Sequence, residues 1–269
     1  MKKLIAMLLV LTMVLSFAAC AKQDTVTPTV ADVTITTAAA DPTPAAETEA
    51  SDPAPVVTGM SHADYVAADN ETEVVVETYV QAHQSWWDNK VTVYCQSPDG
   101  AYFLYELACS EEDAAKLVPG TKIRVTGFKG EWSGEVEIMD GTFEFVEDGD
   151  TYVAEALDVT DLLGTDELID HQNEFVSFTG LTVAPSTDAN GNEAAFLYNW
   201  DGSGEKGNDL YFNVTVNGQT YNFCVESYLC GQDTEVYQAV EALQIGDVIN
   251  AEGFLYWYEG VNPHITSVS

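Results

Sequence analysis

A glycine-marked segment occurs twice in this chain, and the repeat constrains the fold more than any other feature. The first copy runs from Leu117 to Phe128 and the second from Leu243 to Phe254. The matched pairs share one offset of 126 positions and are Leu117/Leu243, Gly120/Gly246, Ile123/Ile249, Gly127/Gly253, Phe128/Phe254 and Gly134/Gly260. Because glycine, aliphatic and aromatic residues all match at a single offset, we infer a duplicated domain.

The length and the charge of the chain limit its organisation and its partners. A chain of 269 residues that contains a duplication is expected to form two domains of about 100 residues each. It carries 44 acidic against 9 basic residues, and residues 61–269 hold 38 of the acids but 6 of the bases. Such a surface repels phosphate backbones, so we expect no nucleic acid among the partners.

The first 19 residues have the composition of an export signal. Lys2 and Lys3 precede a mostly apolar run that ends at Phe17 and is followed by small residues. The run is short for a membrane-spanning helix, which indicates a signal peptide over residues 1–19. The segment from Ser16 to Cys20 resembles the lipobox of bacterial lipoproteins, although Phe17 stands where that family usually has leucine. An ordinary signal peptide with an incidental cysteine is the alternative.

The lipobox resemblance implies where the protein is located. In that family the cysteine carries a diacylglycerol and becomes the first mature residue, so Cys20 would anchor the chain to the membrane on its extracellular face. Residues 20–60 are rich in Thr, Ala and Pro and show no apolar periodicity, which predicts a disordered tether. The folded domains are then expected over residues 61–156 and 157–269.

Each copy is predicted to hold five strands and one short helix. Alternating and β-branched runs, turn residues and helix caps give these boundaries. In the first copy the strands are Glu73–Gln81, Lys90–Gln96, Ala101–Leu107, Thr121–Lys129 and Glu135–Val146, with a helix that Ser110 caps. In the second they are Asn173–Ala184, Leu210–Val216, Gln219–Val225, Asp247–Tyr258 and Val261–Val268, with a helix from Asp233 to about Leu243. A connector helix is predicted over Asp158–Gln172, and Pro185–Gly207 is read as an insertion.

A helix between the third and fourth of five strands is the order of an OB fold. The first copy, over most of residues 72–147, resembles the OB-fold modules of bacterial secreted and surface proteins through its Gly120–Gly127 segment and Gly134. The predicted fold is therefore mainly β, with two tandem OB-like five-stranded barrels. A β-sandwich with the same number of strands is the structural alternative.

The loops on the ligand side of an OB fold would carry aromatic residues next to acids. OB folds bind ligands on strands 2 and 3 and in the loops that join strands 1–2 and 4–5. Aromatic rings suit stacking on sugar rings, while acids accept hydrogen bonds from hydroxyl groups. The alternative is that these aromatics fill the barrel ends. The candidate ligand residues are Trp86, Trp87, Asp88, Glu131, Trp132, Trp200, Tyr256, Trp257 and Tyr258.

Two further groups of residues bear on metal binding and on disulfide bonds. The insertion begins like a calcium loop at Asp188, Asn190, Asn192 and Glu193, but it lacks the glycine and glutamate of an EF-hand, and a solvated hairpin is the alternative. Calcium is the one possible cofactor that the sequence suggests. The remaining cysteines are Cys95, Cys109, Cys224 and Cys230, and we expect buried free thiols, although export permits disulfides. The predicted hairpin places Cys95 opposite Tyr102 or Phe103 and not opposite Cys109, and Cys224 and Cys230 are too far apart for a bridge if that stretch is extended.

No motif in the sequence supports catalysis. The four histidines are dispersed, and His264 in the last strand is expected to be a packing residue. We therefore expect a lipid-anchored cell-surface protein that is not an enzyme and binds carbohydrate or a cell-wall fragment. The alternative is a structural or accessory surface protein with a protein partner, ahead of a nucleic-acid-binding OB protein or a hydrolase.

Overall fold

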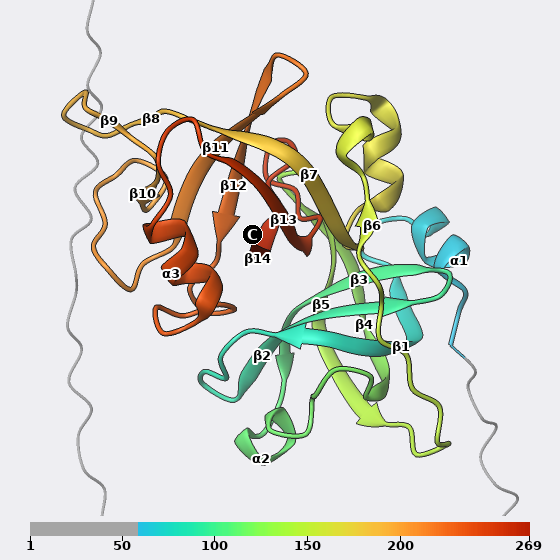
Figure 1. The fold of residues 1–269 in the computed structure, drawn as a ribbon. Helices are drawn as coiled ribbons and strands as arrows, with labels where there is room; N and C mark the ends of the chain where they lie inside the picture. The colour runs from blue at the N-terminus through green and yellow to red at the C-terminus, as the bar shows by residue number, and fades with distance from the viewer. Residues whose placement is uncertain (1–58) are drawn as a thin grey trace, which may run out of the picture. The chain divides into compact units, whose positions relative to one another are not determined.

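Five strands of the first domain pair in the closed order β1-β2-β3-β5-β4 (Figure 1). The computed structural model describes residues 59–269, and the predicted signal peptide, Cys20 and nearly all of the predicted tether lie outside them. The pairing of β3 with β5 is parallel and the other contacts around the ring are antiparallel. The five strands are β1 (Glu73–His83), β2 (Lys90–Ser97), β3 (Gly100–Ala108), β4 (Lys122–Trp132) and β5 (Glu135–Phe145).

The second domain repeats this topology. Its ring runs β7-β11-β12-β14-β13 and closes through pairing of β11 with β7, and the contact between β12 and β14 is again parallel. The strands are β7 (Phe175–Ala184), β11 (Leu210–Val216), β12 (Gln219–Val225), β13 (Val248–Phe254) and β14 (His264–Val268). Closure of both rings confirms the OB-like barrels and rules out the sandwich.

The short helices lie where the OB order requires them. Helix α2 (Glu111–Ala114) separates β3 from β4, and α3 (Glu235–Glu241) separates β12 from β13. The Ser110 hydroxyl accepts a hydrogen bond from the Asp113 backbone N–H, as the predicted cap requires. An additional helix, α1 (His62–Ala67), precedes the first barrel and was not predicted.

The segments around the barrels differ more from the sequence-based prediction. The connector predicted as one helix over 158–172 is instead two 3-10 helices, η1 (Thr160–Leu162) and η2 (Asp166–His171), preceded by the short strand β6 (Leu157–Asp158). The insertion forms three two-residue strands, β8 (Ser186–Thr187), β9 (Glu193–Ala194) and β10 (Leu197–Tyr198). Among residues 59–269, no helix has both the length and the apolar character that a bilayer crossing needs.

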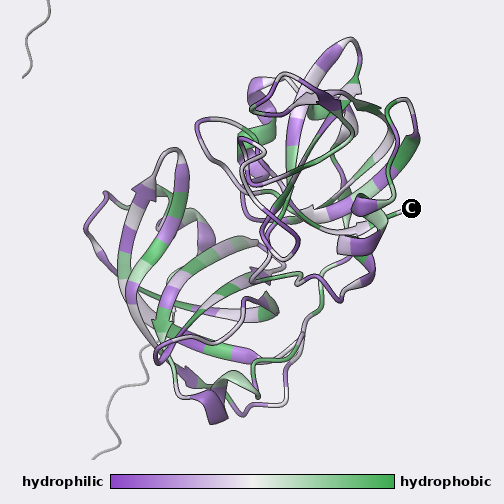
Figure 2. Cartoon of the chain, turned by 90° about the vertical axis from the view of Figure 1, so that its left-hand side faces the viewer, coloured by the Kyte–Doolittle hydropathy of each residue, from purple (hydrophilic) through white to green (hydrophobic). Residues whose placement is uncertain are grey.

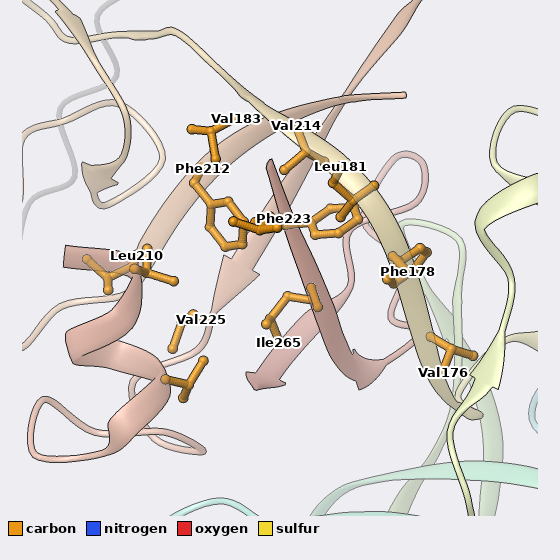
Figure 3. Packing of buried hydrophobic residues seen from close by; sticks show 14 of the residues in the cluster. Val176, Phe178, Leu181, Val183, Leu210, Phe212, Val214, Phe223, Val225 and Ile265 are labelled. Atoms are coloured by element: carbon orange, nitrogen blue, oxygen red, sulfur yellow. The ribbon is translucent and has the colours of Figure 1, made fainter. Parts of the chain in front are cut away.

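Each barrel is filled by the inward-facing residues of its alternating strands. Figure 2 shows apolar and polar residues alternating along the strands, as the pleat of a half-buried sheet requires. In the second barrel the rings of Phe178 and Phe223 lie 4.8 Å apart between their centroids and Val214 and Leu181 pack above them (Figure 3). Cys95, Cys109, Cys224 and Cys230 are buried free thiols, as predicted.

The repeated glycine is needed because two strands approach closely at a bulge. Gly127 and Gly253 lie at corresponding irregularities in the pairing of β4 with β5 and of β13 with β14. A Cβ added to Gly253 would overlap the His264 carbonyl oxygen and lie 2.7 Å from Ile265 Cα, both backbone atoms. The glycine match seen in the sequence is therefore a steric requirement of barrel closure.

We expect Gly253→Ala to destabilise the protein by about 1–3 kcal/mol, because the backbone of β14 must shift to admit the methyl group. Urea unfolding of residues 59–269 measures the change. The matched control is Gly231→Ala, since the nearest atom to a Cβ at that position is 3.6 Å away in ordinary contact. Equal stability of the two variants would contradict the steric explanation.

Candidate functional site

The two barrels belong to one compact unit and share a third hydrophobic cluster. Tyr94 and Phe103 project from the outer faces of β2 and β3, and Phe254 stacks on Tyr94 at a centroid distance of 4.5 Å. Tyr256 contacts Phe103 edge-on at 5.2 Å. The outer face of the first barrel, which an OB fold uses for ligands, is thus partly covered by the second barrel.

Polar contacts lock the same junction. The Gln96 side-chain oxygen accepts a hydrogen bond from the Phe175 backbone N–H at 2.7 Å. The buried carboxylate of Glu135 accepts one from the Trp257 backbone N–H at 2.8 Å, while its other oxygen has no partner. Burial raises the pKa of Glu135 to about 8. The group is therefore mostly protonated at neutral pH, which removes the cost of a buried charge.

His264 is a packing residue at this junction, as expected. Its Nδ1 lies 2.6 Å from the Tyr94 hydroxyl in hydrogen-bond contact, and its ring stacks on Tyr256 at 4.1 Å. Burial lowers the pKa of His264 to about 3, so the imidazole is neutral. The ring therefore acts as a rigid, uncharged surface at the edge of the adjoining cavity.

A cavity of about 1070 Å³ lies beside this contact. Corresponding strands of the two barrels line it: Thr92, Phe103, Tyr105, Glu137 and Met139 come from β2, β3 and β5, and Tyr211, Asn222 and His264 from β11, β12 and β14. Corresponding loops close its rim. The loop residues and nearby strand ends are Gln84, Trp132, Trp200, Glu226, Tyr256 and Tyr258–Asn262. The ligand faces of two OB-like barrels therefore enclose one shared space, called here the cleft.

The cleft combines aromatic surface with carboxyl and amide groups. Burial raises the pKa of Glu137 to about 7, and burial together with the charge of Asp209 does the same for Glu226. Each group is then a mixture of carboxylic acid and carboxylate near neutral pH and can donate or accept a hydrogen bond. Asn222 and Asn262 add amide groups to the same lining.

The structure divides the predicted ligand residues into four groups. Trp132, Trp200, Tyr256 and Tyr258 line the cleft, and Trp132 and Trp200 are 61% and 77% exposed. Trp87, 76% exposed, lines a smaller neighbouring hollow. Trp86 donates from Nε1 to the Cys109 carbonyl and packs on the first core, while Trp257 packs on the second, so both fill barrel ends. Asp88 and Glu131 line neither hollow.

Several lining residues were not singled out from the sequence. Glu137 and Tyr105 alternate with inward-facing residues on their strands, a signal that they point outward. That signal does not reveal the second barrel opposite them. Glu226 follows the end of β12 directly, and its position in the cleft depends on the same packing.

The predicted calcium loop forms a hydrogen-bonded turn. Asp188 Oδ1 accepts from the backbone N–H groups of Asn190 and Asn192, each at 2.8 Å, and Oδ2 accepts from the Asn192 side chain. Glu193 belongs to β9. Within residues 59–269, no group of three or more His, Cys, Asp or Glu side chains is arranged to hold a metal. Calcium binding stays a prediction.

The six basic residues of the described chain are each engaged in a polar contact. Lys90 pairs with Glu106 at 2.7 Å, and Arg124 pairs with Glu77. Lys129 is buried and donates to two backbone carbonyls of α1 and its C-cap. The other three pair with acids: Lys116, Lys122 and Lys206. Each of these bases therefore has an acid or a backbone carbonyl group as its neighbour.

No protein-family model matches this sequence, and no curated protein matches it. Solved structures do match in fold. A murine DNA-binding protein bound with double-stranded DNA is 11% identical, with 72% of this chain and 94% of that chain covered at a TM-score of 0.35. The Ifi202 HINa domain in complex with 20-bp double-stranded DNA is 9% identical, covering 74% and 96% at a TM-score of 0.34.

A replication protein A heterotrimer bound to single-stranded DNA also matches, at 11% identity and a TM-score of 0.26, covering 74% of this chain and 50% of that chain. At these values the likeness extends to the fold alone. It nevertheless corrects one expectation: the exclusion of nucleic acid as a partner is wrong, because structures with this type of fold are solved in complex with DNA. Each of these three structures is a complex with DNA, and no reaction is stated for any of them.

The raised pKa of Glu135 predicts how stability depends on pH. The folded state holds this proton more tightly than the unfolded state, so its contribution is complete below about pH 4.5 and is lost as pH rises to about 8. Glu135→Gln mimics the protonated form, so we expect a smaller loss of unfolding free energy between pH 5 and 9 than in the unsubstituted protein. Urea titrations at both pH values measure it. The exposed residue Glu155 provides the control Glu155→Gln, and an unchanged pH slope in Glu135→Gln would refute the assignment.

Proposed function

We propose that this protein is a non-enzymatic binding module whose ligand is a neutral carbohydrate held in the cleft. The observation that carries the proposal is the joint lining of one cavity by the ligand faces and loops of both barrels. OB folds bind oligosaccharides and oligonucleotides on this face. The composition of the cleft favours the first of these two classes.

The chemistry of the cleft is complementary to sugar rings. Trp132, Trp200 and Tyr258 offer exposed aromatic faces on which the C–H faces of sugars stack. At neutral pH, Glu137 and Glu226 can accept hydrogen bonds from hydroxyl groups as carboxylates or donate hydrogen bonds to them as carboxylic acids. The cleft lining includes neither lysine nor arginine within the described residues. A neutral ligand is therefore favoured over an anionic one, because the lining offers no cation to pair with a negative charge.

Trp132→Ala should weaken carbohydrate binding by about 1 kcal/mol, or roughly fivefold, through loss of one stacking face. Calorimetric titration of residues 59–269 with oligomers of β-1,4-linked N-acetylglucosamine and of β-1,4-linked glucose measures it. The matched control is Phe128→Ala, because Phe128 is an exposed aromatic on the same strand but outside the cleft. A single-stranded thymidine oligonucleotide is the competing probe.

Three outcomes of this titration bear on the proposal. Saturable binding of a neutral oligomer that Trp132→Ala weakens and Phe128→Ala preserves supports it. Absence of saturable binding by both carbohydrate series overturns it. Binding of the oligonucleotide alone, lost in Trp132→Ala, also overturns it and assigns the cleft to nucleic acid.

The location of the module follows from the N-terminal resemblance, and we propose a lipid anchor at Cys20 on the extracellular side of the cell membrane. The tether over residues 20–60 would then hold the barrels away from the membrane surface. We expect Cys20→Ser to move the full-length chain from the membrane fraction to the soluble fraction of a bacterial expression host. Membrane association that survives this substitution would contradict lipid anchoring.

A further inference from the structure

A second hollow of about 400 Å³ adjoins the cleft. Three residues, Gln84, Thr92 and Tyr105, line both spaces, so the two hollows are adjacent, and together they are called here the groove. The far end of the groove is lined by Trp87 and Tyr228, which are 76% and 62% exposed. Two large exposed aromatics in one hollow are unusual for a surface without a partner.

The local backbone holds Trp87 in a fixed place. Trp87 and Lys90 exchange backbone hydrogen bonds of 3.0 and 2.9 Å around a two-residue turn. Asp88 and Asn89 at its centre have φ of 47° and 61°, the left-handed values of a type I′ turn. The exposed indole therefore sits on a tight hairpin end and not on a long loop.

The second barrel contributes Tyr228 to a hollow that is otherwise lined by the first barrel. Tyr228 belongs to the segment between β12 and α3 of the second barrel, and its carbonyl accepts from the Ser85 N–H at 2.7 Å and from the Ser85 hydroxyl at 3.1 Å. This contact brings Tyr228 beside the Trp87 turn. Lys90 and Glu106 also line the hollow but pair with each other at 2.7 Å, which leaves no net charge from that pair.

We propose that the hollow around Trp87 and Tyr228 is a second subsite for the same ligand, so that the protein binds a linear neutral oligosaccharide that extends along the groove and not a single sugar unit. This inference rests on the proposed function of the cleft. The aromatic residues of the two hollows, Trp132 with Trp200 in the cleft and Trp87 with Tyr228 in the second hollow, would stack on different sugar units. Gln84, Thr92 and Tyr105 would supply polar contacts between them.

The test compares oligomers of one to six β-1,4-linked N-acetylglucosamine units by calorimetric titration. Affinity of the unsubstituted protein should rise between the dimer and the hexamer, because the longer chain fills both subsites. Trp87→Ala should weaken hexamer binding by about tenfold and leave dimer binding unchanged, whereas Trp132→Ala should weaken both. Tyr228→Ala should have the same effect as Trp87→Ala, because it removes the second aromatic ring of the same hollow. This substitution keeps the backbone carbonyl that accepts from Ser85, so the contact between the domains is retained.

The results separate this inference from the function on which it depends. If the dimer binds and Trp132→Ala weakens it, but affinity does not rise with length or Trp87→Ala leaves the hexamer unaffected, the second subsite is wrong and the cleft assignment stands. If no oligomer binds, both proposals fail. Val118→Ala is the control for an exposed apolar side chain elsewhere, and an effect on the hexamer equal to that of Trp87→Ala would also overturn the subsite.

Discussion

The contact between the two barrels is the interaction on which the rest of the structure depends. Tyr94, Phe103 and Phe254 exclude water from a cluster that belongs to neither barrel core. Such a contact buries the aromatic surface that each outer sheet face would otherwise expose. The side chains of Gln96 and Glu135 in the first domain accept hydrogen bonds from backbone N–H groups of the second, and these bonds fix the orientation in which the rings meet. Together they convert two small barrels into one unit with a cavity at its junction.

The same contact determines the electrostatics of the cavity. Three glutamates near the junction, Glu135, Glu137 and Glu226, all have raised pKa values, chiefly because burial disfavours the charged carboxylate. The cleft lining is therefore not uniformly charged, although the chain has many more acidic than basic residues. His264, kept neutral by burial, adds a flat ring at the edge of the cavity. Apart from the exposed Glu259 at the rim, the lining consists of aromatic and neutral or partly neutral polar groups in a protein whose sequence is strongly acidic.

The basic residues show how a strongly acidic chain uses its few cations. Lys90 and Arg124 each pair with an acid on an adjacent strand, and Lys129 caps the end of α1 from within the first domain. These contacts neutralise nearby acids or carbonyl groups at separate points of the fold. Exposed pairs of this kind add little stability. Their effect here is that each described base has an acid or a carbonyl group beside it.

The sequence by itself determined the two barrels. The repeat at Gly127 and Gly253, the alternating strands and the Ser110 cap are local signals, and each acts within a few residues of the chain. It also placed Trp132, Trp200 and Tyr258 in ligand-side loops, but could not separate them from Trp86 and Trp257, because exposure of a ring depends on what packs against it. Only the tertiary structure decided that division, brought Glu137 and Tyr211 into the lining of one cleft and placed Tyr228 with Trp87 in one hollow. The physical reason is that contacts between domains depend on the complementarity of two whole surfaces, which no local pattern records.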